Sequence, residues 1–322
     1  MAKKFVADLR TGEAIDEVFL LRSKELKTTR AGAPYLQGDL VDKTGAIPAR
    51  MWDATELLFL SLPDDGFVKV KGRVETYQGN LQVIIKHISK ADETAVRLSD
   101  FLPQTEKNVD KMMAELRRVA ESVADPNLKK LLLSFLDDKD FVQRFRSAPA
   151  ATQYHHAYLG GLLEHTLSLV NLGLRLLSDD YPMIRRDLIV TGLILHDIGK
   201  VRELAFPCGL PNDPRTFQYT DEGQLIGHLI IGASMVEEKA RAIEGFPPEL
   251  LNVLKHMILS HHGEYEFGSP KLPMTVEAVA LHHIDNLDAK IHAFHKAIQE
   301  DKNPASNWTE FNRMFDRRLF KK

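Results

Sequence analysis

The spacing of apolar residues changes once along this 322-residue chain, and that change constrains the fold more than any other feature. From about Asp16 to Lys90, apolar residues recur at every second position, which is the period of half-buried strands, and turn residues interrupt the pattern. After Asp92 they recur at intervals of three and four residues, which is the period of amphipathic helices. We therefore expect a β region followed by an α region.

The β region predicts a small barrel. Turn sequences at 42–45 and 78–80 separate strands, and a short helical segment is expected at 54–60. The expected strands are residues 17–28, 35–41, 46–52, 67–77 and 81–89. Three strands, a short helix and two more strands are the element order of an OB-fold, a Greek-key barrel whose exposed strand face often binds single-stranded nucleic acid.

Alternation along the strands separates an inner from an outer face of this barrel. Val68, Val70 and Val74 are expected to point inward, so the residues between them point outward. The outer face mixes aromatic rings, on which bases stack, with cations, which follow phosphates. The predicted nucleic-acid-binding residues are Tyr35, Arg50, Trp52, Lys69, Lys71, Arg73 and Tyr77. The alternative interpretation is that these side chains only form the solvated face of half-buried strands.

The α region predicts an all-helical domain. Apolar residues from Leu116 to Val123 share one helix face and would meet a common core. Residues 93–106 are predicted to be a linker, with a domain boundary near residue 95. The predicted fold is thus multidomain, with a small all-β OB-fold nucleic-acid-binding domain in 1–95 followed by an all-α domain in 96–322.

Charge and cysteine content exclude several classes of protein. Lys and Arg number 42 against 45 Asp and Glu, so the net charge of −3 excludes a chain that binds nucleic acid by bulk positive charge. The single cysteine, Cys208, can form neither an intramolecular disulfide nor a thiolate-rich zinc site, and its stretch, 206–214, predicts a loop. No signal peptide and no run of about 20 apolar residues is present, so we expect a cytoplasmic protein without a membrane partner.

Histidines are concentrated in the helical region. Of 13 histidines, 12 lie between residues 155 and 295, and several accompany an aspartate within apolar runs. A lone histidine on an apolar helix is usually a satisfied core residue, but a whole series would cost several kcal/mol if left unpaired. A bound cation satisfies such a series together. The residues in question are His165, His196, Asp197, His228, His261, His262 and Asp285.

This residue set predicts two divalent transition metal ions. Neutral imidazole suits Mn, Fe, Co, Ni and Zn, whereas Mg prefers oxygen donors. Five imidazoles and two carboxylates exceed one four-coordinate site, but two ions about 3.5 to 4 Å apart, bridged by a carboxylate and a water, would use them all. Two divalent ions, two carboxylates and one hydroxide leave about one positive charge for a phosphodiester anion.

The series of His165, the pair His196 and Asp197, and Asp285 resembles the HD superfamily of metal-dependent phosphohydrolases. The resemblance implies a first ion held by these four residues. It implies a second ion held by Asp197 together with the three additional histidines, His228, His261 and His262. It also implies that Lys200, one turn after Asp197, contacts a phosphate oxygen, the alternative being an exposed cation at a helix end.

The order of motifs is more specific than any one of them. The stretches 195–200 (LHDIGK), 259–263 (LSHHG), 268–271 (GSPK) and 285–290 (DNLDAK), behind an OB-fold, resemble the YhaM-type 3′-to-5′ exoribonucleases over nearly the whole chain. The resemblance implies removal of nucleoside 5′-monophosphates from the 3′ end of single-stranded RNA, and action on single-stranded DNA as well. It implies Mn or Co as favoured ions, a hydroxide bridging them as the attacking group, and Asp197 and Lys200 as catalytic residues.

Two rival functions remain open. One is a phosphohydrolase of a small nucleotide or a cyclic dinucleotide, although residues 263–270 read GEYEFGSP and lack the Gly-Tyr-Pro of the HD-GYP enzymes. The other is a non-enzymatic single-strand-binding protein with a structural metal. Whether the chain forms a homo-oligomer stays open as well. Most of the remaining histidines are expected to be surface or packing residues, with His282 and His283 as candidates for supporting the site without a ligand role. Asp288 and Lys290 could orient Asp285, bind substrate or form a salt bridge.

Overall fold

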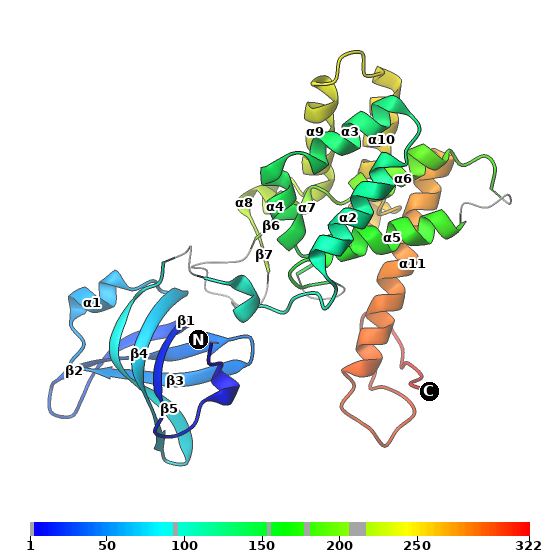
Figure 1. Cartoon of the computed structure of the whole chain (residues 1–322). Helices are drawn as coiled ribbons and strands as arrows, with labels where there is room; N and C mark the ends of the chain where they lie inside the picture. Colours follow the sequence, from blue (N-terminus) through cyan, green and yellow to red (C-terminus); the bar gives the residue numbers. More distant parts are fainter. Residues whose placement is uncertain (1–2, 93–95, 153–155, 177–180, 206–216) are drawn as a thin grey trace. The chain divides into compact units, whose positions relative to one another are not determined.

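The structure of the chain is a computed structural model that describes residues 3–92, 96–152, 156–176, 181–205 and 217–322. By its contacts the chain divides between Gln104 and Thr105 into two compact units. The first is built of strands and the second of helices (Figure 1). The expected loop at 206–214, with Cys208, lies outside the described residues.

The first unit is a closed five-stranded barrel (Figure 1). Its strands follow the order β1-β2-β3-β5-β4, and β1 closes the barrel by pairing with both β2 and β4. All pairs are antiparallel except the short parallel pairing of β3 with β5. The elements are β1(Ala14–Thr28), β2(Pro34–Asp42), β3(Gly45–Trp52), α1(Glu56–Ser61), β4(Gly66–Tyr77) and β5(Asn80–Lys90). This element order confirms the OB-fold prediction.

The barrel core is formed by the inward positions of these strands. Val68, Val70 and Val74 are fully buried, as their alternation predicted, and Phe19 and Leu40 fill the interior beside them. Because side chains alternate along a strand, burying these positions exposes the polar residues between them. The inner and outer faces predicted for β4 are therefore those of the structure.

The stretch predicted to be a linker carries structure of its own. A short helical turn, η3(Leu98–Asp100), is followed by the buried Phe101, whose ring centroid lies 4.7 Å from that of Phe67 in β4. The backbone amide of Lys43 donates to the carbonyl of Asp100 at 3.0 Å. Contacts thus join residues up to Gln104 to the barrel. The functional division of the chain near residue 95 stays a prediction.

The second unit is helical, with one core (Figure 1). Several of its helices begin at a side chain that caps free backbone amides: Asn108 accepts from Lys111 N at the start of α2, and Thr275 accepts from Ala278 N at the start of α11. A two-residue strand pair, β6(Leu204–Ala205) with β7(Gln218–Tyr219), and the non-helical residues 301–322 depart from the all-helical prediction. The helices are α2(Val109–Glu121), α3(Pro126–Leu136), α4(Lys139–Ser147), α5(Gly161–Leu176), α6(Arg186–Leu195), α7(Lys200–Glu203), α8(Asp221–Leu225), α9(His228–Arg241), α10(Pro248–Ser260) and α11(Val276–Gln299).

Buried leucines hold the helices that carry the predicted site. Leu162 of α5, Leu193 of α6 and Leu281 of α11 are fully buried and belong to one cluster with Leu254 and Met257 of α10. Burying one such side chain contributes about 1.5 to 3 kcal/mol, so this cluster fixes the helices against one another. Of the helices in the described part of the chain, none combines the length and apolar character that a membrane crossing requires.

Candidate active site

All seven predicted ligand residues come together in the helical unit. Each occupies a helix or the turn directly after one, and the nitrogen and oxygen atoms of neighbouring members lie within 4.8 Å of one another in overlapping groups. The groups are His165, His196 and Asp285; His196, Asp197 and His261; and His228, His261 and His262. A side-chain set spread over 121 positions of sequence is thus one cluster in space.

The turn after α6 presents His196 and Asp197. Helix α6 ends at Leu195, and residues 196–199 form a turn before α7. The sequence predicted that this pair lies on a helix, and the structure places it in the turn after one. Gly199 makes the turn possible, because a Cβ on it would lie 2.1 Å from the carbonyl oxygen of His228. The turn therefore packs directly against the start of α9, which carries His228.

The turn after α10 presents His261 and His262 in a similar way. Helix α10 ends at Ser260, and Gly263 follows with φ +82°, a left-handed conformation that favours glycine. A Cβ at Gly263 would lie 2.1 Å from Cε1 of His282, so only glycine lets the turn that carries His261 and His262 pack directly on the His282 ring. His282 donates from Nδ1 to the carbonyl of His261 at 2.9 Å and supports the turn from below.

Asp197 is the centre of the cluster. Its Oδ1 faces His228 Nε2 at 3.5 Å and His261 Nε2 at 3.4 Å. Its Oδ2 faces His196 Nε2 at 3.3 Å, and Lys200 Nζ pairs with the same oxygen at 2.7 Å. One carboxylate thus lies between the two halves of the histidine cluster, the arrangement that a bridging ligand requires.

The imidazole rings are oriented so that their Nε2 atoms point inward. In four of them Nδ1 donates to an acceptor behind the ring, which leaves Nε2 as the nitrogen with the free lone pair. The four bonds run from His196 to Leu193 O at 2.9 Å, from His261 to Ile258 O at 2.8 Å, from His262 to Phe267 O at 2.7 Å and from His228 to Glu203 Oε1 at 2.8 Å.

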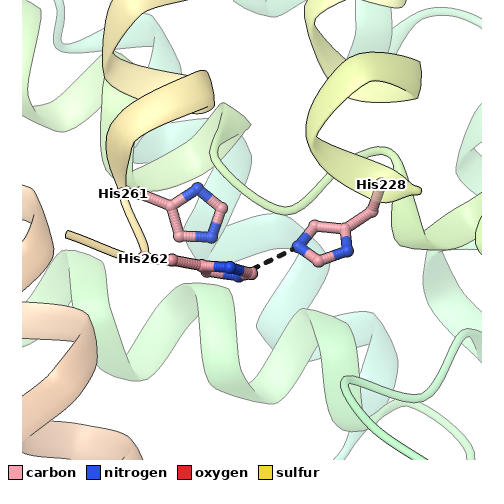
Figure 2. A group of neighbouring side chains, drawn as sticks. All are labelled: His228, His261 and His262. Atoms are coloured by element: carbon pink, nitrogen blue, oxygen red, sulfur yellow. Dashed lines mark hydrogen bonds between the residues drawn. The ribbon is translucent and has the colours of Figure 1, made fainter. Parts of the chain in front are cut away.

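The inward atoms are acceptors that face other acceptors. Figure 2 shows His228, His261 and His262, with the Nε2 atoms of His228 and His262 only 3.2 Å apart. Asp197 Oδ1 and His196 Nε2 are buried and have no hydrogen-bond partner among the described residues. Buried lone pairs without a hydrogen to share are costly, and a cation among them removes that cost. The donor set therefore fits metal ions.

The protonation of the cluster follows from burial and charge. Burial alone would lower the pKa of His165, but Asp285 at 3.2 Å from Nε2 and Asp288 at 3.2 Å from Nδ1 raise that pKa to about 9. Burial and the neighbouring His261 lower the pKa of His262 to about 4. The pKa of Asp197 is lowered against its burial, mainly by the ammonium of Lys200. A metal ion would therefore replace the proton of His165.

Two carboxylates support the histidines from outside the predicted ligand set. Glu203 received no role from the sequence, which left open whether Asp288 orients Asp285. Glu203 accepts from both Nδ1 and the backbone amide of His228, at 2.8 and 2.9 Å. Asp288 accepts from Ser168 Oγ at 2.7 Å and faces His165, so it orients that histidine rather than Asp285. Their spacing was the available signal, because Glu203 and Asp288 follow Lys200 and Asp285 by three residues, close to one helical turn. His156 is buried near Asp288, its Nε2 3.8 Å from Oδ2.

The predicted binding residues of the barrel form two groups. In the first, the rings of Tyr35 and Trp52 lie 5.2 Å apart on paired positions of β2 and β3. The guanidinium of Arg50 lies 5.3 Å from the ring centroid of Tyr77. Trp52 and Tyr77 are exposed, so base-stacking faces are available on this part of the barrel.

The second group lies where β1 pairs with β4. Lys69 and Lys71 reach Asp16 with Nζ to carboxylate distances of 2.7 and 3.5 Å, and Arg73 Nε donates to the carbonyl of Gly12 at 3.1 Å. All three cations thus have a partner on β1 or the turn before it. Across β5, Arg50 and Arg73 both pair with Ile84, so the two groups lie on neighbouring strands. That these seven residues bind nucleic acid stays a prediction.

Comparison with known proteins agrees with this architecture. Residues 162–290 match the HD domain family. A 3′-5′ exoribonuclease YhaM from Geobacillus sp. (strain WCH70) is 38% identical over 302 residues, which are 93% of this chain and 89% of the relative. The chain belongs to the YhaM family. The protein of the same name from Bacillus subtilis (strain 168) is 36% identical over 292 residues, 90% of each chain. This YhaM-family chain is therefore a nuclease, as the sequence predicted.

A solved structure is similar to less than a third of this chain. The second OB-fold domain of replication protein A from Methanococcus maripaludis is 17% identical and covers 29% of this chain and 98% of its own, with a TM-score of 0.22. The barrel of the YhaM-family chain is assigned from its strand order and closure.

Proposed function

We propose that this chain is a metal-dependent 3′-to-5′ exonuclease that hydrolyses the terminal phosphodiester of single-stranded RNA and releases nucleoside 5′-monophosphates. Single-stranded DNA is a second substrate in this proposal, and the cytoplasm is the place of action. The relatives named 3′-5′ exoribonuclease cover most of the chain and support the substrate and the direction of cleavage.

One observation carries the metal dependence. The buried Oδ1 of Asp197 has no hydrogen-bond partner among the described residues, and the two Nε2 atoms that face it belong to rings whose Nδ1 already donates elsewhere. Asp197 Oδ1 and the Nε2 atoms of His228 and His261 therefore face one another with lone pairs and no hydrogen between them. Two divalent ions, Mn or Co before Fe, Ni or Zn, match a donor set dominated by imidazole.

The residues that would hold the ions fall on either side of Asp197. His165, His196 and Asp285 lie on one side, and His228, His261 and His262 on the other. Ions bound there would supply Lewis-acid stabilisation of the phosphodiester and lower the pKa of a water molecule.

Lys200 adds a residue of fixed positive charge. Burial lowers its pKa, but Asp197 outweighs this and raises it, so the ammonium stays protonated. Its Nζ lies 2.7 Å from Asp197 Oδ2, within the centre of the cluster. We assign Lys200 to contact a phosphate oxygen of the substrate, where a point charge stabilises the negative charge of the transition state.

A cleavage assay with labelled RNA tests this function. Metal-stripped protein is incubated with 5′-labelled single-stranded RNA, Mn, Co, Zn or Mg is added separately, and the products are resolved by length. We expect a ladder that shortens from the 3′ end only after metal is added. Intact RNA with confirmed metal loading would overturn the proposal, and turnover of small nucleotides under the same conditions would make them the substrate.

A further inference from the structure

The last 22 residues of the chain carry a charge opposite to that of the whole. Residues 301–322 contain six Lys and Arg and three Asp and Glu, a net charge of +3, whereas the chain carries −3. No residue of this segment belongs to the metal cluster or to the predicted barrel face. Its charge therefore has no role in the site already described.

The segment is an ordered irregular hairpin. Thr309 N donates to Leu319 O, and Asn312 N donates to Arg317 O, both at 2.9 Å. Lys321 Nζ pairs with Asp301 at 2.7 Å and ties the end of the hairpin to the residues that follow α11. These bonds fix the hairpin's own conformation.

An aromatic contact anchors the turn of the hairpin on α11. Phe315 lies near the turn, and its ring centroid is 4.9 Å from that of Phe294 in α11. The backbone of such an anchored hairpin loses little conformational entropy when a ligand binds to it.

Large apolar side chains remain exposed on this hairpin. Trp308, Phe311 and Phe320 are 50, 55 and 48% exposed, and Met314 is exposed beside them. The rings of Trp308 and Phe320 lie 5.1 Å apart. Several exposed rings on one short segment mark a binding surface more often than an inert one.

Three arginines lie among these rings. Arg313, Arg317 and Arg318 are exposed and form no salt bridge in the part of the chain that the structure describes. Glu310 and Asp316, the exposed carboxylates of the hairpin, form no salt bridge with these arginines in the described part of the chain. Unpaired guanidinium groups interleaved with exposed aromatic rings are the combination that binds single-stranded nucleic acid, through phosphates and through base stacking.

A cavity of about 600 Å³ lies between this hairpin and the end of α11. Ala293 and Lys296 line it from the helix, and Phe311, Arg313 and Phe315 from the hairpin. Three carboxylates line it too, of which Glu300 pairs with Lys296 and Asp301 with Lys321, while Glu310 is exposed. Helix α11 also carries Asp285, eight residues before Ala293, which at 1.5 Å per residue is about 12 Å along the helix axis. The helix part of the cavity lining therefore begins about 12 Å from Asp285 along the axis of α11 and continues to Glu300.

We propose that the C-terminal hairpin and the end of α11 form a second binding surface for single-stranded RNA, which holds the strand next to the nucleotide that is being removed. This inference rests on the proposed function and adds a substrate contact within the helical unit. Phosphates contact the three arginines, and bases stack on Phe311 and on the Trp308–Phe320 pair.

A double charge reversal, Arg313→Glu with Arg317→Glu, tests the surface in the full-length protein. Its control is Arg118→Glu with Arg144→Glu, two exposed arginines of α2 and α4 that likewise form no salt bridge among the described residues. Binding of labelled single-stranded RNA is measured in chelator over a range of salt concentrations. We expect weaker binding and a slope of log K against log salt that is smaller by about 1.4 for the hairpin variant only, since each phosphate contact on a single strand contributes about 0.7.

Phe311→Ala provides a second variant that keeps the charge. Loss of one stacked base should weaken RNA binding roughly 5- to 150-fold without a change of salt slope. With metal added, the ratio of RNA hydrolysis to hydrolysis of bis(p-nitrophenyl) phosphate should fall, because this small diester reaches only the metal site. Tyr181→Ala removes an equally exposed ring of the helical unit and should leave the ratio unchanged.

Three outcomes separate the possibilities. RNA binding and salt slope equal to those of the control would overturn the proposal. A changed oligomeric state with unchanged RNA binding would overturn it too, and would make the hairpin an interface between copies. A wild-type protein that binds RNA through the hairpin but hydrolyses neither substrate with bound metal would uphold the surface and refute the proposed nuclease mechanism.

Discussion

Two aspartates show how differently the barrel and the helical unit use charge. Asp16 on the barrel is exposed, pairs with Lys69 and Lys71, and its pKa is lowered mainly by the hydrogen bond from Lys69. Asp197 in the helical unit is buried, and of its two oxygens only Oδ2 has a cation, that of Lys200. The barrel cluster is complete without a ligand, whereas the helical cluster is not.

That difference decides what each cluster can contribute. Exposed ion pairs are screened by water and contribute about 0 to 1 kcal/mol, so Asp16 and its lysines can exchange partners with a phosphate strand at little cost. A buried carboxylate among imidazoles keeps its position, because moving it would leave a neighbouring buried polar group without its partner, which is costly. The barrel surface therefore suits binding that tolerates many sequences, and the helical cluster suits chemistry that needs fixed positions.

Removing the two aspartates should give the largest contrast. Asp197→Ala is expected to lower RNA hydrolysis by about 10³-fold or more, because the carboxylate between the two halves of the cluster is lost. RNA binding by the barrel should persist, and Asp16→Ala should retain hydrolysis of a small diester. Product formation from labelled RNA measures the effect, and full activity of the Asp197 variant would contradict the mechanism.

Stability of the metal-free protein should depend on pH through His165. Its pKa of about 9 in the folded chain lies above the value near 6.5 of a free imidazole, so its contribution is complete below about pH 6.5 and is lost as pH rises to about 9. The expected loss is about 3 kcal/mol at most. Urea unfolding in chelator measures it, and metal saturation, which removes the proton, should abolish this slope.

Metal binding should stabilise the helical unit and leave the barrel unchanged. At a metal concentration of about 100 times Kd the expected gain is about 2.7 kcal/mol, or a rise in Tm of roughly 5 to 10 °C for a unit of this size. Asp197→Asn should lose most of that rise. Thermal unfolding with and without Mn measures it, and an equal shift in the Asn variant would place the metal elsewhere.

The smallest effects are expected on the barrel surface. Trp52→Ala should weaken RNA binding by about 1 to 3 kcal/mol, because an exposed ring loses a stacked base. Lys69→Ala should have a smaller effect, because the ammonium of Lys69 already pairs with Asp16 and would have to leave it to contact a phosphate. Fluorescence titration with single-stranded RNA compares the two, and a larger loss for Lys69 would favour phosphate contacts over stacking.

The sequence predicted the helical cluster well because burial limits the choices there. A carboxylate such as Asp197 inside an apolar run is expected to be buried and therefore needs polar partners. Other polar residues inside apolar runs are buried for the same reason, so they are the candidates to meet it. Glu203 and Asp288 stand behind the ligands, and their role depends on which histidine each one reaches across the fold. Their hydrogen bonds, to His228 and His165, required the packed structure.

The barrel surface was predictable in its strands but not in its contacts. Strand bounds differ from the expected ones by at most three residues, because alternation and turn residues specify register. Exposed side chains, by contrast, can pair with any of several residues on the neighbouring strand. Nothing in the spacing of Lys69 and Lys71 indicated that Asp16, across the β1–β4 pair, would hold both.

The contact of Gly199 with the His228 carbonyl has a consequence for the choice of ion. The backbone of the turn packs directly on the backbone of α9 there, and a Cβ at Gly199 would lie only 2.1 Å from the His228 carbonyl oxygen, so this contact resists a closer approach of the two halves of the cluster. We expect ionic radius to be accommodated by rotation of the imidazole rings instead. Replacing Gly199 with alanine should therefore increase the separation of the two halves of the cluster, and a variant that still folds should prefer larger ions.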